Sequence, residues 1–216
     1  MIASTRLHYP DLVVDTERIV GDSVEALLDR STGQAMLVVG SRGLDQMGRL
    51  VLGSTSVAVA GRSKVPVVIV PSGWPGWQPR SHHVEPVVVG LDPAQDGEEL
   101  LDFAFTQAAS RGVGLVTVTA VPPEPGIESS IEARQRATTR TTDDVLRGSG
   151  AAHPGVPVRT DQFLGYPVPS LLQASLGAPL LVVGRHHSGH FGFRIGSVTR
   201  EVLHRAEVPV AVVPLA

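Results

Sequence analysis

A glycine-rich turn in the first third of the chain has the residue types and spacing of an anion-binding site. Gly40 and Gly43 are followed, after nine residues, by the pair Gly53-Ser54, which precedes a segment of helical pattern. Glycines let backbone amides approach an oxygen-rich group closely, and the start of a helix presents N–H donors together with the positive end of its dipole. A phosphate fits such a turn. Ser54 and Thr55 would add hydroxyl donors, although serine is equally well explained as the N-cap of the helix.

A second version of this turn exists because the sequence repeats itself. Three segments recur in register: Leu37–Gly40 as Leu181–Gly184, Gly53-Ser54 as Gly196-Ser197, and Val65–Val67 as Val208–Val210. The second copy has one residue fewer between its glycine anchors. Glycines, serines and prolines that recur at a nearly constant offset over this length indicate a duplication. Gly184, Gly196 and Ser197 are therefore a second set of candidate phosphate contacts.

Secondary-structure signals in the second copy alternate between strand and helix. Short apolar runs predict buried strands, and apolar residues three or four apart predict helices. The predicted strands are 86–91, 114–121, 156–163, 180–183 and 208–213, and the predicted helices are 97–111, 127–146, 170–175 and 197–205. Strands joined by helices in this way imply parallel pairing with right-handed crossovers, which is a doubly wound parallel α/β sheet of five strands.

The first copy is shorter than the second. Its predicted elements are strands at 12–19, 36–39 and 65–70 and helices at 23–30 and 54–62. Met1 aligns with Val145, inside the second copy, so the sequence contains no counterpart of the first two strands. Three explanations remain open: a misplaced start, strands supplied by another chain, or a degenerate first half that covers a working second one.

The segment between the two copies is predicted to be a linker, because it holds prolines, glycines and both tryptophans without an apolar period. The expected organisation is an incomplete domain at 1–71, a linker at 72–85 and a complete domain at 86–216. Without its central strand, the first copy should leave its fourth strand, 36–39, at an open edge that invites pairing with another chain.

The spacing of the first turn, followed by a helix and a Val-Pro-Val strand, resembles the universal stress protein family. The segment Val87–Asp92 is similar to the family's first strand, whose last aspartate contacts the nucleoside. The resemblance covers nearly the whole chain as two tandem domains, the first truncated. It implies an adenine nucleotide alpha hydrolase-like fold with its five strands in the order 3-2-1-4-5.

The resemblance also implies a ligand, since one branch of the family binds ATP. In that branch the phosphates and ribose lie on the glycine loop, and the adenine lies near the ends of the first and second strands. Carried over, this implies Asp92 and the backbone of Ala120 as nucleoside contacts, and Gly184, Gly196, Ser197 and Val198 on the phosphate side.

The second copy departs from the family pattern within the loop itself. His187 stands where the second glycine is expected, and glycines reappear displaced at Gly189 and Gly192. Gly189 is therefore included among the candidate contacts, and a protonated histidine is an alternative phosphate contact in place of the lost amides. The first copy keeps the complete loop but lacks the strand that would carry the matching aspartate. Neither copy holds a full site within itself.

Histidines gather near this loop and raise the question of a metal site. His186, His187 and His190 lie within five residues, and His204 follows on the next predicted helix. Such a cluster could hold zinc or nickel, but no nearby carboxylate completes it in sequence. We expect no metal there, and a solvated loop or a phosphate contact instead.

Composition and missing motifs exclude several functional classes. A formal net charge of −3 provides no basic surface for nucleic acid or an anionic membrane, and the absence of cysteine excludes disulfides and thiol catalysis. No long apolar run or secretory start is present, so a cytoplasmic location is expected. P-loop, nucleophile-elbow and zincin motifs are absent, and we expect no catalytic residues.

The leading hypothesis is a universal stress protein that acts as a regulatory module binding an adenine nucleotide, with ATP as the expected ligand and at most slow hydrolysis. One alternative is a family member that binds no nucleotide and acts as a dimerising or partner-binding scaffold through its Val-Pro-Val strands. The other is a slow ATPase or nucleotidyltransferase relative. Either a homodimer or a pseudo-dimer within one chain is expected.

Overall fold

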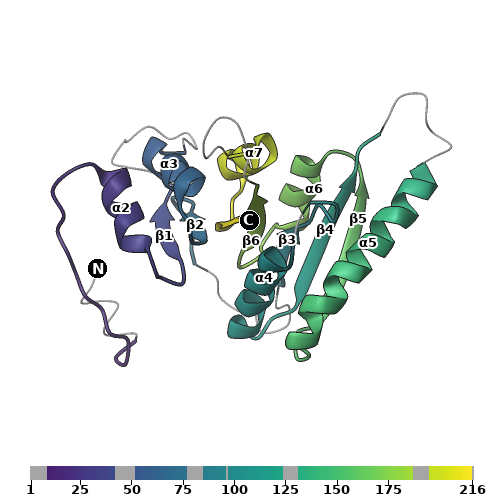
Figure 1. Ribbon diagram of the computed structural model, residues 1–216, viewed down its shortest axis with the longest axis horizontal. Helices are drawn as coiled ribbons and strands as arrows, with labels where there is room; N and C mark the ends of the chain where they lie inside the picture. The colour runs from purple at the N-terminus through teal and green to yellow at the C-terminus, as the bar shows by residue number, and fades with distance from the viewer. Residues whose placement is uncertain are drawn as a thin grey trace.

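A computed structural model describes residues 9–41, 52–76, 85–95, 97–123, 131–186 and 195–215 (Figure 1). Its elements follow one another as α2 (Ser23–Ser31), β1 (Leu37–Gly40), α3 (Ser54–Arg62), β2 (Val67–Val70), β3 (Val87–Gly90), α4 (Glu98–Arg111), β4 (Leu115–Val121), α5 (Ile131–Ala152), β5 (Val158–Leu164), α6 (Pro167–Ala174), β6 (Leu181–Arg185), α7 (Ser197–Arg205) and β7 (Val210–Pro214). These strands form one seven-stranded sheet in the order β1-β2-β7-β6-β3-β4-β5. No helix in the described residues has the length and apolar character needed to cross a bilayer.

The second repeat forms the doubly wound sheet that the sequence predicts. Its strands lie in the order β5-β4-β3-β6-β7 and all pair in parallel, which confirms the implied order 3-2-1-4-5. The largest changes in bounds are at two helices: α5 ends at Ala152, beyond the predicted end, and α6 begins earlier, at Pro167. Proline is well suited to a first helical turn, because its φ angle is fixed near the helical value and that turn needs no N–H there.

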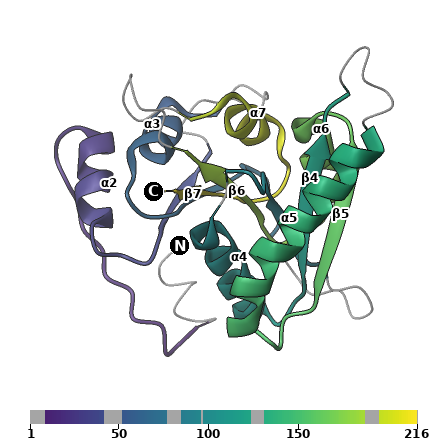
Figure 2. The same ribbon diagram turned by 45° about the vertical axis from the view of Figure 1, so that its right-hand side comes forward.

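The two repeats are joined through the strands that follow their Val-Pro-Val segments. β2 pairs with β7 antiparallel, with Val67 opposite Val212, Val68 opposite Ala211 and Ile69 opposite Val210. The sequence predicted two sheets, and the structure merges them into one continuous sheet. Figure 2 shows β6 and β7 between helices α2 and α3 of the first repeat and strands β4 and β5 of the second. Each proline still contributes as an acceptor: the carbonyl oxygens of Pro66 and Pro209 accept from Leu37 N–H and Leu181 N–H, each at 2.9 Å.

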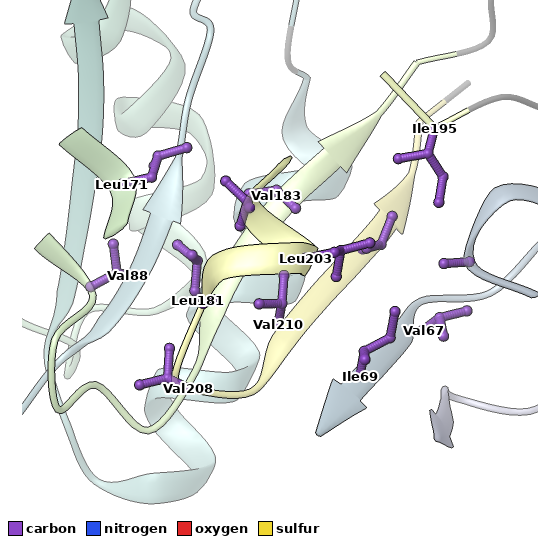
Figure 3. Close-up of a cluster of buried hydrophobic side chains, with 14 of the residues drawn as sticks. Val67, Ile69, Val88, Leu171, Leu181, Val183, Ile195, Leu203, Val208 and Val210 are labelled. Carbon is purple, nitrogen blue, oxygen red and sulfur yellow. The ribbon is translucent and has the colours of Figure 1, made fainter. Parts of the chain in front are cut away.

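A hydrophobic core on each face stabilises this sheet. One core packs α3, α6 and α7 on the sheet, and Figure 3 shows Val67 and Ile69 of β2 in the same layer as Val210 of β7 and Leu203 of α7. The other core packs α4 and α5 on the opposite face and includes residues of β3, β6 and β7. Because the first core continues across the β2–β7 joint, the two repeats share buried apolar surface as well as backbone hydrogen bonds.

The predicted strand at 12–19 is wrong, since residues 12–20 contain no regular secondary structure. Its counterpart β5 pairs along its whole length with β4, and no described strand of the first repeat corresponds to β4. A strand without a neighbour has no ladder to form, so the apolar alternation here has nothing to pack against. Val13 and Val20 are accordingly 85% and 93% exposed. An ion pair between Glu17 and Arg30 connects the segment to α2.

β1 is the edge strand of the sheet on the side of the first repeat, as the predicted loss of the central strand requires. Its side chains alternate between half-buried and exposed, and Val38 is 57% exposed. Within the described residues, the β1 edge that faces away from β2 has no strand beside it.

We predict that a fragment of residues 1–72 self-associates or is poorly soluble, whereas the full chain associates less. In the fragment β2 loses β7, so both edges of a two-stranded sheet become available for pairing. Light scattering on the two proteins measures the difference. The same fragment carrying Val38→Lys should associate less, because a charge on an edge strand opposes pairing. A monomeric and soluble 1–72 fragment would show that the edges are protected.

Candidate functional site

A cavity of about 740 Å³ opens at the carboxyl ends of β3, β4 and β6. Six of the predicted site residues line it: Asp92, Ala120, Gly184, Gly196, Ser197 and Val198. Its volume lies in the range of small-molecule sites, and its position is the crevice where open α/β sheets bind ligands. Residues that the sequence places more than 100 positions apart, such as Asp92 and Ser197, therefore meet in one pocket.

The predicted residues of the first repeat lie elsewhere. Gly40, Gly53, Ser54 and Thr55 surround the end of β1 and the start of α3, and β2, parallel to β1, runs opposite to β7. The carboxyl ends of the strands of the two repeats therefore point in opposite directions, and the two glycine turns lie at opposite ends of the strands. Beside the first turn, Ser41 lines a cavity of about 20 Å³, which is large enough for a water molecule and too small for a nucleotide.

Some predicted residues lie outside the described part of the chain. These are Gly43 in the first turn and Gly189 in the second, together with His187, Gly192 and His190 of the altered loop. Their roles as phosphate contacts remain predictions.

Asp92 shapes the turn that follows β3. Its Oδ1 accepts from Ala94 N–H at 3.2 Å, and its Oδ2 accepts from the Gln95 side-chain amide at 2.6 Å. The backbone closes the same turn, since Gln95 N–H donates to the Asp92 carbonyl oxygen at 2.9 Å. Aspartate at the first position and proline at the second favour this kind of turn. The exposed carboxylate is thereby held at the mouth of the cavity.

The start of α7 forms another part of the wall. Gly196 is its N-cap and has no side chain, so no capping oxygen occupies the first N–H groups of the helix. Thr199, one turn in, donates its hydroxyl to the carbonyl oxygen of Gly184 at 3.1 Å. This bond ties the end of β6 to the start of α7, which fixes the orientation of the helix N-terminus toward the cavity. An N-terminus in this position favours an anionic ligand group.

The first repeat contains the same connection. Ser56 Oγ donates to the Gly40 carbonyl oxygen at 2.7 Å, and Ser56 corresponds to Thr199. The candidate hydroxyls predicted from sequence were those of Ser54, Thr55 and Ser197, and this pair was not among them. The available signal was that both copies place a hydroxyl residue at the same position of the repeat.

Two further parts of the wall come from tertiary packing. Gly90 ends β3, and a Cβ added there would lie 2.7 Å from Leu171 Cδ2, so a larger residue would require the Leu171 side chain of α6 to move. On the other side, Ala137, Thr138 and Thr141 of α5 line the cavity. The sequence predicted α5 as a polar helix but gave no sign that this face closes a pocket.

Three side chains that carry or can acquire charge line the described part of the cavity: Asp92, Arg185 and His186. Arg185 ends β6 and is only 2% exposed. Its Nη2 donates to the carbonyl oxygen of Ser63, at the C-cap of α3, at 2.6 Å. Burial lowers the pKa of Arg185 through desolvation, but a guanidinium remains charged in proteins. Arg185 therefore contributes a positive charge close to the cavity, with its guanidinium bonded at the C-terminus of α3.

No group of three or more His, Asp or Glu side chains suited to a metal ion occurs among the described residues. His186 lines the large cavity, whereas His204 lines the small one beside Ser41. His204 is therefore not among the described residues that line the large cavity.

Comparison with known proteins gives consistent matches. The model of the family described as "Universal stress protein family" matches residues 3–71 and 83–214. A universal stress protein of Mycobacterium tuberculosis is 34% identical over 207 residues, covering 93% of this chain and 69% of that protein. One of Mycolicibacterium smegmatis is 33% identical over 207 residues, covering 94% of this chain and 69% of that protein.

Solved structures share the fold. A universal stress protein from Archaeoglobus fulgidus matches with a TM-score of 0.65 at 24% identity, covering 90% of this chain and 67% of that one. A crystal structure from Pseudomonas aeruginosa matches with a TM-score of 0.69 at 18% identity, covering 99% of this chain and 76% of that one.

We predict that Thr199→Val lowers the free energy of unfolding by about 1 kcal/mol, because it removes a largely buried hydrogen bond to the Gly184 carbonyl oxygen. Urea denaturation followed by circular dichroism measures this as a lower midpoint. Thr139→Val is the matched control, since the exposed Thr139 hydroxyl donates within α5, to the Gln135 carbonyl oxygen. Equal effects of the two changes would contradict a structural role for the Thr199 bond.

Proposed function

The chain belongs to the universal stress protein family, and from that premise we propose that it is a regulatory protein that binds an adenine nucleotide in the cavity of its second repeat. The observation that carries the proposal is the meeting of Asp92, Ala120 and the Gly184 and Gly196–Val198 segments around one cavity. The family resemblance implies these same residues as nucleotide contacts.

The chemistry of the cavity changes from one side to the other in a way that suits a nucleotide. Ala120, Pro122 and Ala137 give an apolar surface near the ends of β3 and β4, which fits a base. Asp92 lies at the mouth and can accept hydrogen bonds from ribose hydroxyls. The N-terminus of α7, with Ser197 and Val198, lies on the other side and fits the phosphates.

The lining residues favour binding over rapid hydrolysis. Among the described residues that line the cavity there is no lysine and no glutamate, and Asp92 is the single carboxylate. Both oxygens of that carboxylate accept hydrogen bonds within their own turn. Arg185 lines the same cavity and carries a positive charge, but phosphoryl transfer also depends on a group that orients the attacking nucleophile. We therefore propose a binding and regulatory role with at most slow hydrolysis.

The scaffold alternative meets an obstacle in the fold. It requires the strands after the Val-Pro-Val segments to pair with another chain, but β2 and β7 pair with each other here. A partner-binding role would have to use a different surface. For this reason the nucleotide hypothesis is preferred.

We predict that ATP raises the midpoint of thermal unfolding of the wild type, by about 5–10 °C at a concentration 100 times its Kd. Asp92→Ala should reduce the shift, because it removes the acceptor at the mouth of the cavity. Gly196→Val should abolish it, because the added side chain enters the space beside the α7 N-terminus. This change suits the backbone, since Gly196 has φ −59° and an added Cβ would meet nothing within 4 Å.

Gly53→Val is the matched control, because Gly53 is the N-cap of α3 at the corresponding position of the first repeat and also has an ordinary backbone conformation, with φ −64°. It should retain the full shift. Loss of the shift in Gly53→Val alone would place the nucleotide in the first repeat. A wild type that shows no shift with ATP, ADP or AMP would refute nucleotide binding, and rapid phosphate release would refute the regulatory assignment.

A further inference from the structure

The two repeats differ at the residue that follows the first glycine of each turn. The first repeat has Ser41 at this position and the second has Arg185. Ser41 makes a local contact, since its Oγ accepts at 3.0 Å from the N–H of Ser72, the residue that directly follows the first repeat. Arg185 instead crosses the joint, because its guanidinium donates to the Ser63 carbonyl oxygen of the first repeat at 2.6 Å. The larger side chain converts a local contact into a contact between repeats.

The near-symmetry of the joint shows what the arginine adds. Ala206 is the C-cap of α7 and corresponds to Ser63, the C-cap of α3; each backbone N–H bonds back into its own helix at 2.8 Å. At the symmetric position, where Ser41 replaces the arginine, a cavity of about 20 Å³ remains, lined by Ser41 and Ala206. The two sides of the joint are therefore not equivalent: one is bridged by Arg185 and the other contains a small space.

The acceptor of this bridge is itself held firmly. Ser63 is 1% exposed, its N–H donates to Val59 O at 2.8 Å, and its hydroxyl bonds to Val65 O at 2.8 Å. Its carbonyl oxygen lies at the C-terminal end of α3, where the helix dipole favours a cation. The guanidinium is therefore held at the C-terminus of α3, and Arg185 is also one of the residues that line the large cavity.

We propose that Arg185 couples the binding of an anionic ligand in the cavity to the docking of the first repeat. This inference rests on the proposed function, since the anion is the phosphate part of the nucleotide. The positive charge of Arg185 attracts phosphates at the α7 end, and the bond to Ser63 keeps that charge in place. By linkage, a ligand that is bound more tightly when the first repeat is docked must also stabilise the docked arrangement.

The test compares ATP with adenosine, which lacks the phosphates, on the full chain by isothermal titration calorimetry. Arg185→Met keeps a similar volume and removes the charge, and we expect it to weaken ATP binding about tenfold while adenosine binding changes less than twofold. Arg185→Lys should lie between the wild type and Arg185→Met for ATP. Arg205→Met is the matched control, because it removes an arginine whose guanidinium is exposed and paired with Glu201 within α7; it should leave both ligands unaffected.

Hydrogen exchange on the wild type provides a second measurement that needs no variant. ATP should slow exchange in residues 60–66, at the end of α3, although none of them lines the large cavity. Adenosine should slow it less. If residues 60–66 do not respond while residues of the cavity do, the coupling is refuted, even if Arg185→Met fails to fold.

The outcomes separate this inference from the function on which it rests. A wild type that binds neither ATP nor adenosine refutes both. A wild type that binds ATP, together with an Arg185→Met protein that binds it equally well, refutes the coupling and leaves the proposed function standing. Equal weakening of ATP and adenosine in Arg185→Met also refutes it, since a purely structural effect does not distinguish the two ligands.

Discussion

The antiparallel pairing of β2 with β7 is the interaction on which the arrangement of this protein depends. The described part of the first repeat contributes only two strands to the sheet, and a two-stranded sheet is marginal by itself in water. Pairing with β7 gives β2 a second neighbour and places Val67 and Ile69 in a core that continues under α7. The first repeat is therefore an extension of the second repeat's sheet, and its stability follows from that of the second.

The same pairing decides where ligand chemistry is found. Because β2 and β7 run in opposite directions, the glycine turns of the two repeats lie at opposite ends of the strands. The first repeat therefore cannot supply its intact turn to the cavity at Asp92. It approaches that cavity with the other end of α3, where Ser63 accepts from Arg185. The first repeat thus contacts Arg185, one of the residues lining the cavity, through a helix C-terminus and not through a glycine loop.

Much of this arrangement was predictable from local sequence, and the exceptions have a common cause. Strands β3, β6 and β7 are continuous apolar runs flanked by glycine or proline, so pattern alone located them, and the repeat located the paired turns. The strand predicted at 12–19 is absent because an alternating apolar pattern forms a strand only where a neighbouring strand can pair with it. The counterpart of this segment, β5, pairs with β4, and β4 has no described counterpart in the first repeat. The pairing of β2 with β7, the α5 wall and the reach of Arg185 depend on which surfaces meet in space. Local periodicity carries no information on these tertiary contacts.

The difference between the two repeats is consistent with a division of roles within one chain. In a symmetric pair, both sides of the joint would carry the same residue, and any ligand would affect both repeats alike. Here Ser41 leaves a small cavity on one side, while Arg185 fills the equivalent space on the other and also lines the large pocket. A buried guanidinium requires compensation by acceptors, because desolvation of a charge is costly. The Ser63 carbonyl at the end of α3 provides one such acceptor, so docking of the first repeat helps to hold a cation beside the cavity of the second repeat.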